Sequence, residues 1–268
     1  MVDAWPLLPA ALAGLALIGG LAVLTWLASL ARHDVSLVDR TWSVFIAGAA
    51  LVYALRLPGP SARGGWMLVL AIAWALRLSL FITWRNWGHG EDRRYQAIRA
   101  RNQPHFALKS LVLVFALQAL LAWTVSAPFL VGMAAARPLG GLDAPGFALA
   151  AFGIVFEALG DAQMARFKAD PANRGRVMDG GLWRYTRHPN YFGETCVWWG
   201  VWLMALAGAG WAGAWSVVSP LLMTLLLLKV SGVTLLEKDI AERRPAYRDY
   251  VVRTNAFVPG RPRPKGSA

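Results

Sequence analysis

The chain has 268 residues, of which 57% are hydrophobic and 16% charged, and its mean hydropathy is +0.43. This composition excludes a disordered chain, because disorder requires low hydrophobicity. The single cysteine, Cys196, excludes a disulfide scaffold and a cysteine-rich metal site. The net charge of +12 would suggest a nucleic-acid partner in a soluble protein. Here the basic residues flank apolar segments, which indicates a membrane protein instead.

The apolar segments predict an all-α integral membrane protein. A transmembrane helix needs roughly 20 mostly apolar residues. The first segment is too long for a signal-peptide core and no basic residue precedes it, so we expect an uncleaved span. The uncharged stretch between Glu194 and Lys229 is too long for one crossing, and Gly208–Gly213 is the expected turn. We therefore predict seven transmembrane helices, at about 7–31, 41–55, 65–84, 108–136, 146–167, 191–206 and 214–236.

The distribution of Lys and Arg predicts the orientation of these spans. Basic residues collect on the cytoplasmic side of membrane proteins. With the N-terminus outside, 22 of the 27 basic residues fall in cytoplasmic segments and only Arg56, Arg63 and Arg137 fall outside. This predicts an external N-terminus and a cytoplasmic C-terminus, without any nucleic-acid partner. We expect a single membrane domain over residues 1–268, with a flexible tail at 259–268.

Five ionisable residues lie within or at the ends of the predicted spans: Arg77, Glu157, Asp161, Glu194 and Lys229. Each costs about 2.5–3.5 kcal/mol to insert, so each needs a partner or a function. They could pair with one another or extend to the membrane surface. Glu157 and Asp161 are four residues apart and share one helix face, which predicts a polar cavity open to the cytoplasm.

The densest polar sequence is Gly180–Glu194, GGLWRYTRHPNYFGE. Pro189 suits the first turn of a helix, whose free N–H groups favour an anion. Three cationic donors precede that turn: Arg184, Arg187 and His188. The usual excess of basic residues at the cytoplasmic end of a span would explain the arginines, but not the other polar residues. Asn190 and Glu194, four residues apart, are instead typical of side chains that bind amides or hydroxyls, so we expect a phosphate-bearing ligand here.

Three further polar clusters fall on the predicted cytoplasmic side: 84–95, 167–175 and 236–239, the last with Tyr247 and Tyr250. Convergence of several clusters on one side favours a real site. There is no Gly-rich dinucleotide fingerprint and no Walker loop. The four histidines share no metal-ligand spacing, so we expect no metal.

At Gly181–Glu194 the sequence resembles the steroid 5-alpha-reductase-like integral membrane family, in particular its bacterial DUF1295-type branch. Further matches are RLS at 77–79, GEDRRY at 90–95, FEALGDAQ at 156–163, FKADP at 167–171 and LE at 236–237. The match runs from about Asp39 to Pro259, and seven spans with an external N-terminus also fit this family. The His-Pro-x-Tyr-x-Gly core alone is similar to sterol reductases and isoprenylcysteine methyltransferases as well.

The resemblance implies an NADPH-dependent reductase that saturates a carbon–carbon double bond conjugated to a ketone. Its substrate would be an apolar, steroid-like or other lipid molecule that enters from the bilayer, in the inner (cytoplasmic) membrane of a bacterium. Asn190 and Glu194 would hold the nicotinamide amide and ribose, with Trp198 one turn further on. The cofactor-binding residues carried over are Glu91, Asp92, Asp161, Lys168, Asn173, Arg184, Tyr185, Arg187, His188, Asn190, Glu194, Trp198, Lys229, Glu237 and Tyr247.

The resemblance also implies a pair of side chains that polarises the substrate carbonyl. In this family the pair is a glutamate or glutamine in the second span and a tyrosine in the third. By position, Asp39 or Tyr53 would replace the first, and Trp74 falls where the tyrosine belongs. Trp can donate a hydrogen bond but cannot transfer a proton. Asp39 has a structural alternative, as the N-cap of a helix that begins near Thr41.

Two other functions stay open at this point. One is an S-adenosylmethionine-dependent membrane methyltransferase of the isoprenylcysteine type, and the other is a non-enzymatic lipid binder or transporter. The cluster of Asp161, Lys168 and Asn173 favours the reductase, because a nucleotide with three phosphates needs more basic contacts than adenosylmethionine. The absence of internal repeats and the one-sided polar clusters count against a transporter.

Overall fold

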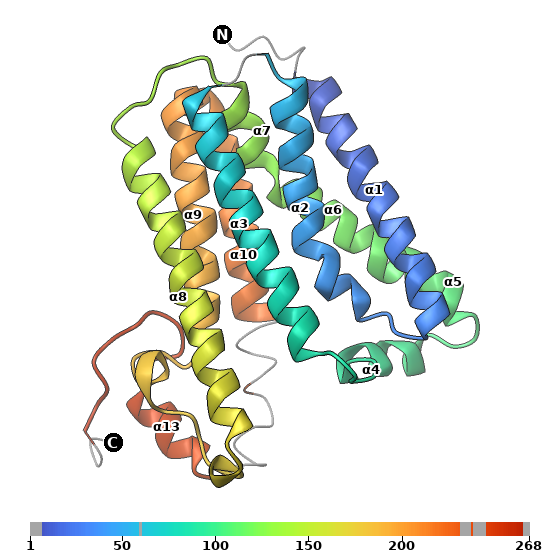
Figure 1. The fold of residues 1–268 in the computed structure, drawn as a ribbon, viewed down its shortest axis with the longest axis vertical. Coiled ribbons are helices and arrows are strands. Elements are labelled where there is room, and N and C mark those ends of the chain that lie inside the picture. Colours follow the sequence, from blue (N-terminus) through green and yellow to red (C-terminus); the bar gives the residue numbers. More distant parts are fainter. Residues whose placement is uncertain (1–6, 59–60, 231–236, 238–244, 265–268) are drawn as a thin grey trace. The chain divides into compact units, whose positions relative to one another are not determined.

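The computed structural model describes residues 7–58, 61–230, 237 and 245–264, and every regular element among them is a helix, as predicted (Figure 1). The α-helices are α1 (Leu7–Arg32), α2 (Leu37–Arg56), α3 (Ala62–Arg85), α4 (Arg93–Arg101), α5 (Phe106–Ser110), α6 (Leu117–Val125), α7 (Ala127–Ala134), α8 (Asp143–Ala169), α9 (Pro189–Ala209), α10 (Val218–Leu225) and α13 (Tyr247–Arg253). Leu111–Ala116 and Leu226–Val230 are π-helical, and Pro171–Asn173, Gly181–Arg184 and Gly210–Val217 are 3₁₀-helical.

Six helical stretches among the described residues are long and apolar enough to cross a membrane: Leu7–Arg32, Leu37–Arg56, Ala62–Arg85, Phe106–Ala134, Asp143–Ala169 and Pro189–Lys229. The chain is therefore a multi-pass membrane protein. The first five stretches coincide with the first five predicted spans, to within a few residues at each end. The last two predicted spans both fall within the stretch that begins at Pro189.

The chain doubles back within this last stretch. α9 ends at Ala209, and Gly210 has a φ of +61°, which favours glycine. The indole N–H of Trp199 donates to Thr224 Oγ1 at 3.3 Å. In one straight helix these residues would lie about 37 Å apart at 1.5 Å per residue. The chain thus reverses its direction near Gly210, within the glycine-rich segment Gly208–Gly213 that predicted the turn. Residues 231–236 of the predicted seventh span lie outside the described residues, so seven crossings and their orientation stay predictions.

The chain divides into two compact units. The first unit contains residues 1–147 and 201–219, and the second contains residues 148–200 and 220–268. The prediction of a single membrane domain stays a prediction.

Tryptophan side chains connect helices of the first unit. The indole N–H groups of Trp26, Trp42 and Trp123 donate to backbone carbonyls of neighbouring helices, at 3.0, 3.1 and 2.9 Å. In the bilayer core no water competes for such carbonyls, so interhelical hydrogen bonds of this kind stabilise packing.

A buried ion pair fastens the start of α3 to the start of α8. Arg63 and Asp143 are each 1% exposed, and their side chains form two parallel hydrogen bonds of 2.7 and 2.8 Å. Arg63 also donates to the carbonyls of Arg137 and Pro138, while Asp143 accepts from the N–H of Gly140. Every strong polar atom of the pair therefore has a partner, as a buried charge requires.

Breaking this pair should destabilise the fold strongly. We expect Arg63→Met to lower the free energy of unfolding in detergent by about 3–5 kcal/mol, because Asp143 would be left buried and uncompensated. Arg56→Met removes an exposed arginine at the end of α2 and should cost about 0.5 kcal/mol or less. The double variant Arg63→Met/Asp143→Leu should recover much of the loss. Equal stability of Arg63→Met and Arg56→Met would contradict this account.

Candidate functional site

In the second unit, α8 and α9 approach until their backbones touch. A methyl group on Gly153 would lie 2.5 Å from the carbonyl oxygen of Gly193, and one on Gly193 would lie 2.7 Å from the amide nitrogen of Glu157. One on Gly160 would lie 3.1 Å from the Pro189 ring. Small residues at these positions are what permit so close a crossing.

This crossing buries a group of polar side chains. Glu157, Asp161 and Glu194 are between 4 and 7% exposed, although all three lie in apolar helices. Asn190 Nδ2 donates to Asp161 Oδ1 at 3.3 Å, so two residues predicted to bind the cofactor are in contact. Asn190 Oδ1 is buried and accepts no hydrogen bond from the described residues.

The glutamate of this group is oriented by an aromatic donor. The indole N–H of Trp198 donates to Glu194 Oε1 at 2.8 Å, one helical turn along α9. Trp198 is fully buried and Glu194 is 4% exposed. The predicted spacing of Asn190, Glu194 and Trp198 thus places three polar side chains along the buried side of one helix.

A second cluster lies just before α9 and centres on Glu237. The Arg187 guanidinium binds its carboxylate through two parallel hydrogen bonds of 2.7 and 2.8 Å. His188 Nε2 lies 2.9 Å from Glu237 Oε1 and must donate, because a carboxylate only accepts. Arg187 Nη1 also donates to the carbonyls of Val251 and Thr254, at 3.1 and 2.6 Å.

These contacts shift the pKa of the Glu237 carboxyl. Burial raises its pKa, but the hydrogen bonds from His188 and Arg187 and the charge of Arg187 outweigh burial and hold the pKa at about 2. Tyr247 donates to the same carboxylate at 3.3 Å. Burial, and then the negative charge of Glu237, raises the pKa of the Tyr247 hydroxyl.

Arg187 and His188 therefore fasten the loop before α9 to the C-terminal part of the chain. The four hydrogen bonds of Arg187 use nearly all the N–H groups of a guanidinium. The structure gives these residues a positioning role, and their contact with a cofactor diphosphate stays a prediction.

The other predicted cofactor residues of the second unit lie nearer the surface. Asn173 donates to the carbonyl of Phe167 at 3.1 Å, which closes the turn after α8. The remaining side chains of this set are exposed in the structure: Lys168, Arg184, Tyr185 and Lys229. Lys229 lies in the π-helical segment Leu226–Val230, a geometry frequently found at functional sites.

Glu91 and Asp92, in the first unit, hold α4 in place. Glu91 forms two 2.8 Å hydrogen bonds with Arg99 and accepts a third from the N–H of Val35 at 2.9 Å. Asp92 caps α4 by accepting from the N–H of Arg94 at 2.9 Å. Burial raises the pKa of both carboxyls, but the arginine and N–H donors outweigh it and leave both pKa values lowered. Cofactor binding by these residues stays a prediction.

The three predicted catalytic residues also belong to the first unit. Asp39 Oδ1 accepts from the Tyr95 hydroxyl at 2.7 Å, and Oδ2 accepts from Arg94 at 2.8 Å. Because α2 begins at Leu37, Asp39 lies within its first turn, and the interpretation of Asp39 as an N-cap is wrong. Tyr53 and Trp74 are each 1% exposed, and the Tyr53 hydroxyl lies 2.9 Å from Ser126 Oγ. Their role at a carbonyl stays a prediction.

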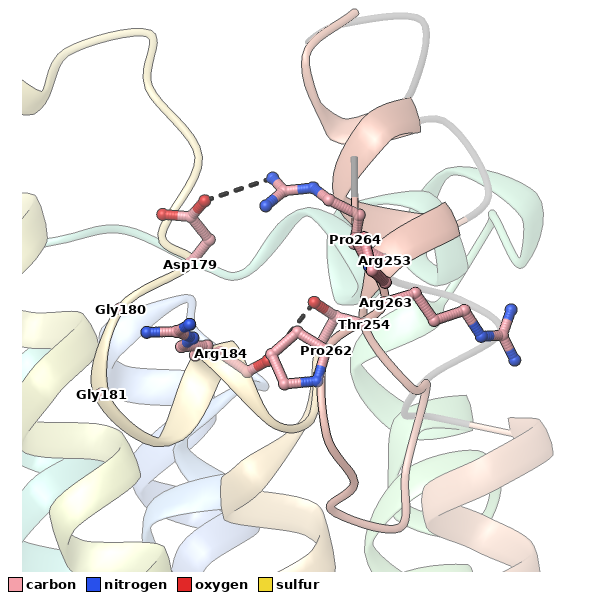
Figure 2. Close-up of a pocket in the computed structure, with 9 residues that line it drawn as sticks. All are labelled: Asp179, Gly180, Gly181, Arg184, Arg253, Thr254, Pro262, Arg263 and Pro264. Carbon is pink, nitrogen blue, oxygen red and sulfur yellow. Dashed lines mark hydrogen bonds and ion pairs between the residues drawn. The ribbon is translucent and has the colours of Figure 1, made fainter. Parts of the chain in front are cut away.

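The second unit contains a cavity of about 440 Å³ that was not predicted from the sequence (Figure 2). It is lined by Asp179, Gly180, Gly181, Arg184, Arg253, Thr254, Pro262, Arg263 and Pro264, of which only Arg184 was predicted to bind a ligand. The reason is that residues from 259 onward were expected to form a flexible tail. Gly260 N–H instead donates to the carbonyl of Tyr185, and Arg263 N–H to that of Arg253, at 3.0 and 2.9 Å.

Within the described part of the chain, no group of three or more His, Cys, Asp or Glu side chains could hold a metal ion.

Comparison with known proteins places this membrane protein in a family. Residues 25–254 match the family described as "Protein of unknown function (DUF1295)", so the chain belongs to that family. The family is commonly steroid 5-alpha-reductase-like, which confirms the resemblance seen in the sequence. A relative is the uncharacterized protein C594.04c of Schizosaccharomyces pombe, 26% identical over 262 residues that cover 87% of this chain and 75% of the relative. No solved structure matches the chain at a significant level.

The Glu237 cluster predicts an acid-dependent stability. A carboxyl whose pKa falls from 4.5 to about 2 on folding stabilises the protein fully above pH 4.5, and this stabilisation is lost as the pH falls toward about 2. Glu237→Gln should therefore lower Tm at pH 7, and the gap to wild type should narrow below pH 4.5. Asp249→Asn, which changes an exposed acid on α13, is the matched control and should leave Tm almost unchanged. A gap independent of pH would show that the charge of Glu237 does not stabilise the fold.

Proposed function

We propose that this protein is a membrane-embedded NADPH-dependent reductase that saturates a carbon–carbon double bond conjugated to a ketone in an apolar, steroid-like or other lipid substrate. The observation that carries the proposal is the buried oxygen of Asn190, which has no donor among the described residues. An unpaired buried acceptor costs free energy, so a ligand that supplies a donor there binds favourably.

The polar residues beside Asn190 fit a nicotinamide riboside. The carboxamide of nicotinamide carries two N–H donors, and Asn190 Oδ1 is an acceptor fixed by the bond from its own Nδ2 to Asp161. Glu194 is a buried carboxylate oriented by Trp198 and suits a ribose hydroxyl. Neighbouring Asp161 adds a further acceptor, so the group matches a ligand rich in amide and hydroxyl donors.

When bound, NADPH supplies the hydride that is transferred to the β-carbon of the enone. The residues of this chain orient the cofactor, exclude water and stabilise the negative charge that develops on the carbonyl oxygen. Asp39, Tyr53 and Trp74 are the candidates for that last task. Uptake of a proton from water at the α-carbon would then complete the reduced product. The substrate reaches the site from the surrounding lipids, which contact the apolar helices.

We further propose seven crossings, with the N-terminus outside and the C-terminus in the cytoplasm, in the inner membrane of a bacterium. The reversal near Gly210 supports two crossings within Pro189–Lys229. The 22 basic residues of the predicted cytoplasmic segments support the orientation.

Ligand-dependent stability tests the choice of cofactor. A ligand that binds only the folded state stabilises it by RT ln(1 + [L]/Kd), about 2.7 kcal/mol at a hundredfold excess over Kd. We expect NADPH to raise the Tm of the detergent-solubilised protein more than NADH does, and S-adenosylmethionine to have no effect. A larger shift with S-adenosylmethionine would favour the methyltransferase and overturn the reductase. Oxidation of NADPH on addition of an α,β-unsaturated steroid ketone would then measure the activity.

Variants in α9 test the nicotinamide site. Asn190→Ala removes the acceptor and Glu194→Ala removes the carboxylate, and each should weaken NADPH binding by about tenfold or more, as expected for a lost buried hydrogen bond. The control is Thr224→Ala, which removes the hydrogen bond that Trp199 of α9 donates to Thr224. This variant should leave NADPH affinity within about twofold of wild type. Affinity like that of wild type in both α9 variants would remove these residues from the site.

Cysteine labelling tests the orientation. Cysteine at Gly141, in the exposed turn before α8, should react with an impermeant maleimide in intact cells. Cysteine at Arg174, in the exposed turn after α8, should react only after the membrane is opened. Buried Cys196 gives the background. The reverse pattern would mean that the N-terminus is cytoplasmic.

A further inference from the structure

The cavity of the second unit has the size and the lining of a small-molecule site. Its volume of about 440 Å³ lies within the range of about 300–1,000 Å³ that ligand pockets occupy. That volume exceeds the needs of a single inorganic ion. One wall is the segment from Asp179 to Arg184, and the other consists of the end of α13 and the residues that follow it (Figure 2).

The charged residues around the cavity favour a doubly negative ligand. Three arginines and one aspartate line it: Arg184, Arg253, Arg263 and Asp179. The two positive charges of Arg184 and Arg253 complement a phosphate monoester, which carries about −1.5 to −2 at pH 7. A phosphodiester carries only a single charge. In Figure 2 the side chain of Arg253 extends toward Asp179 and that of Arg184 lies beside Gly180 and Gly181, whereas that of Arg263 extends away.

The single carboxylate of the lining, Asp179, binds Arg253 so weakly that an anionic ligand can compete with it for this arginine. Asp179 Oδ2 lies 3.3 Å from Arg253, and the two side chains are 52% and 25% exposed. An exposed pair of this kind contributes little to stability, so an anion can take over Arg253 at small cost. Asp179 would then accept a hydrogen bond from a hydroxyl beside the phosphate.

The walls of the cavity are held in place, and one of them is anchored beside the proposed nicotinamide site. Leu182 N–H donates to Gln163 Oε1 at 2.8 Å, and the Trp183 indole donates to the carbonyl of Gly160 at 3.0 Å. These anchors on α8 flank Asp161, which binds Asn190. The cavity and the polar crossing of α8 and α9 therefore share a short segment of one unit.

We propose that this cavity binds the 2′-phosphate of NADPH, with Arg184 and Arg253 donating to the phosphate and Asp179 accepting from the neighbouring ribose hydroxyl. The assignment rests on the proposed reductase function and goes beyond it, because it names the residues that select NADPH over NADH. NADH carries a hydroxyl in place of the monoester and loses the complementary charge.

Dissociation constants for both dinucleotides test the assignment with the full chain in detergent. Wild type should bind NADPH about tenfold or more tighter than NADH. Arg184→Gln and Arg253→Gln should each weaken NADPH binding by about tenfold and leave NADH binding within about twofold. Arg248→Gln removes an exposed arginine of α13 that does not line the cavity, and should leave both constants unchanged. Retained NADH affinity shows that the variants are folded.

The other possible results overturn the assignment, and they show whether the reductase proposal fails with it. Equal loss of NADPH and NADH affinity in the arginine variants, or no loss, overturns the 2′-phosphate site and leaves the reductase proposal standing. Wild type that binds neither dinucleotide overturns both proposals. Nanodiscs with and without phosphatidic acid test the other source of a phosphate monoester. Stabilisation by phosphatidic acid that Arg184→Gln and Arg253→Gln abolish, with NADPH preference intact, would assign the cavity to a lipid headgroup.

Discussion

The close crossing of α8 and α9 is the constraint on which the candidate site depends. Hydrocarbon offers no water to buried polar groups, so each such group must find its partner within the protein. Glycine at 153, 160 and 193 lets the two backbones meet, and the side chains that flank the crossing are then forced together. Asp161 and Asn190 become partners for this reason, although 29 residues separate them. A larger residue at 153 or 193 would meet backbone atoms of the other helix at less than 3 Å and would force the two helices apart.

The segment from Arg187 to Asn190 connects this crossing to the C-terminal part of the chain. Arg187 and His188 bind Glu237, Pro189 begins α9, and Asn190 contacts Asp161. Four consecutive residues thus fix the loop, the start of the helix and the polar contact with α8. Because their positions are coupled through one helical turn, a change in the Glu237 cluster would also displace Asn190. The proline adds to this coupling, since its fixed φ limits the conformations of the turn.

Local properties of the sequence predicted the helices, but they did not predict the contacts between residues far apart in the chain. Apolar runs identified the spans, glycines identified the reversal near Gly210, and the spacing of Asn190 and Glu194 identified their shared face. The pairing of Arg63 with Asp143 spans 80 residues and leaves no periodic signal in either segment. The start of α2 was misplaced by several residues, because polar Asp39 and Arg40 obscured a helix that begins at Leu37. Hydrogen bonds from residues 260 and 263 tie down part of the expected tail through backbone atoms, which composition does not encode.

The residues proposed for carbonyl polarisation are already engaged with other groups. Ser126 Oγ donates its only hydrogen to the carbonyl of Trp123 at 2.7 Å, so Tyr53 must be the donor in its 2.9 Å contact with Ser126. Both oxygens of Asp39 accept strong donors, one of them a guanidinium. In the proposed reaction the ketone oxygen only accepts hydrogen bonds, so its partner must be a donor. Tyr53 can donate to it by giving up one bond between neutral hydroxyls, which contributes about 0.5–1.5 kcal/mol. Asp39 accepts at both oxygens and would have to gain a proton before it could donate. The hydrogen bonds of the resting protein therefore favour Tyr53 as the donor to the ketone.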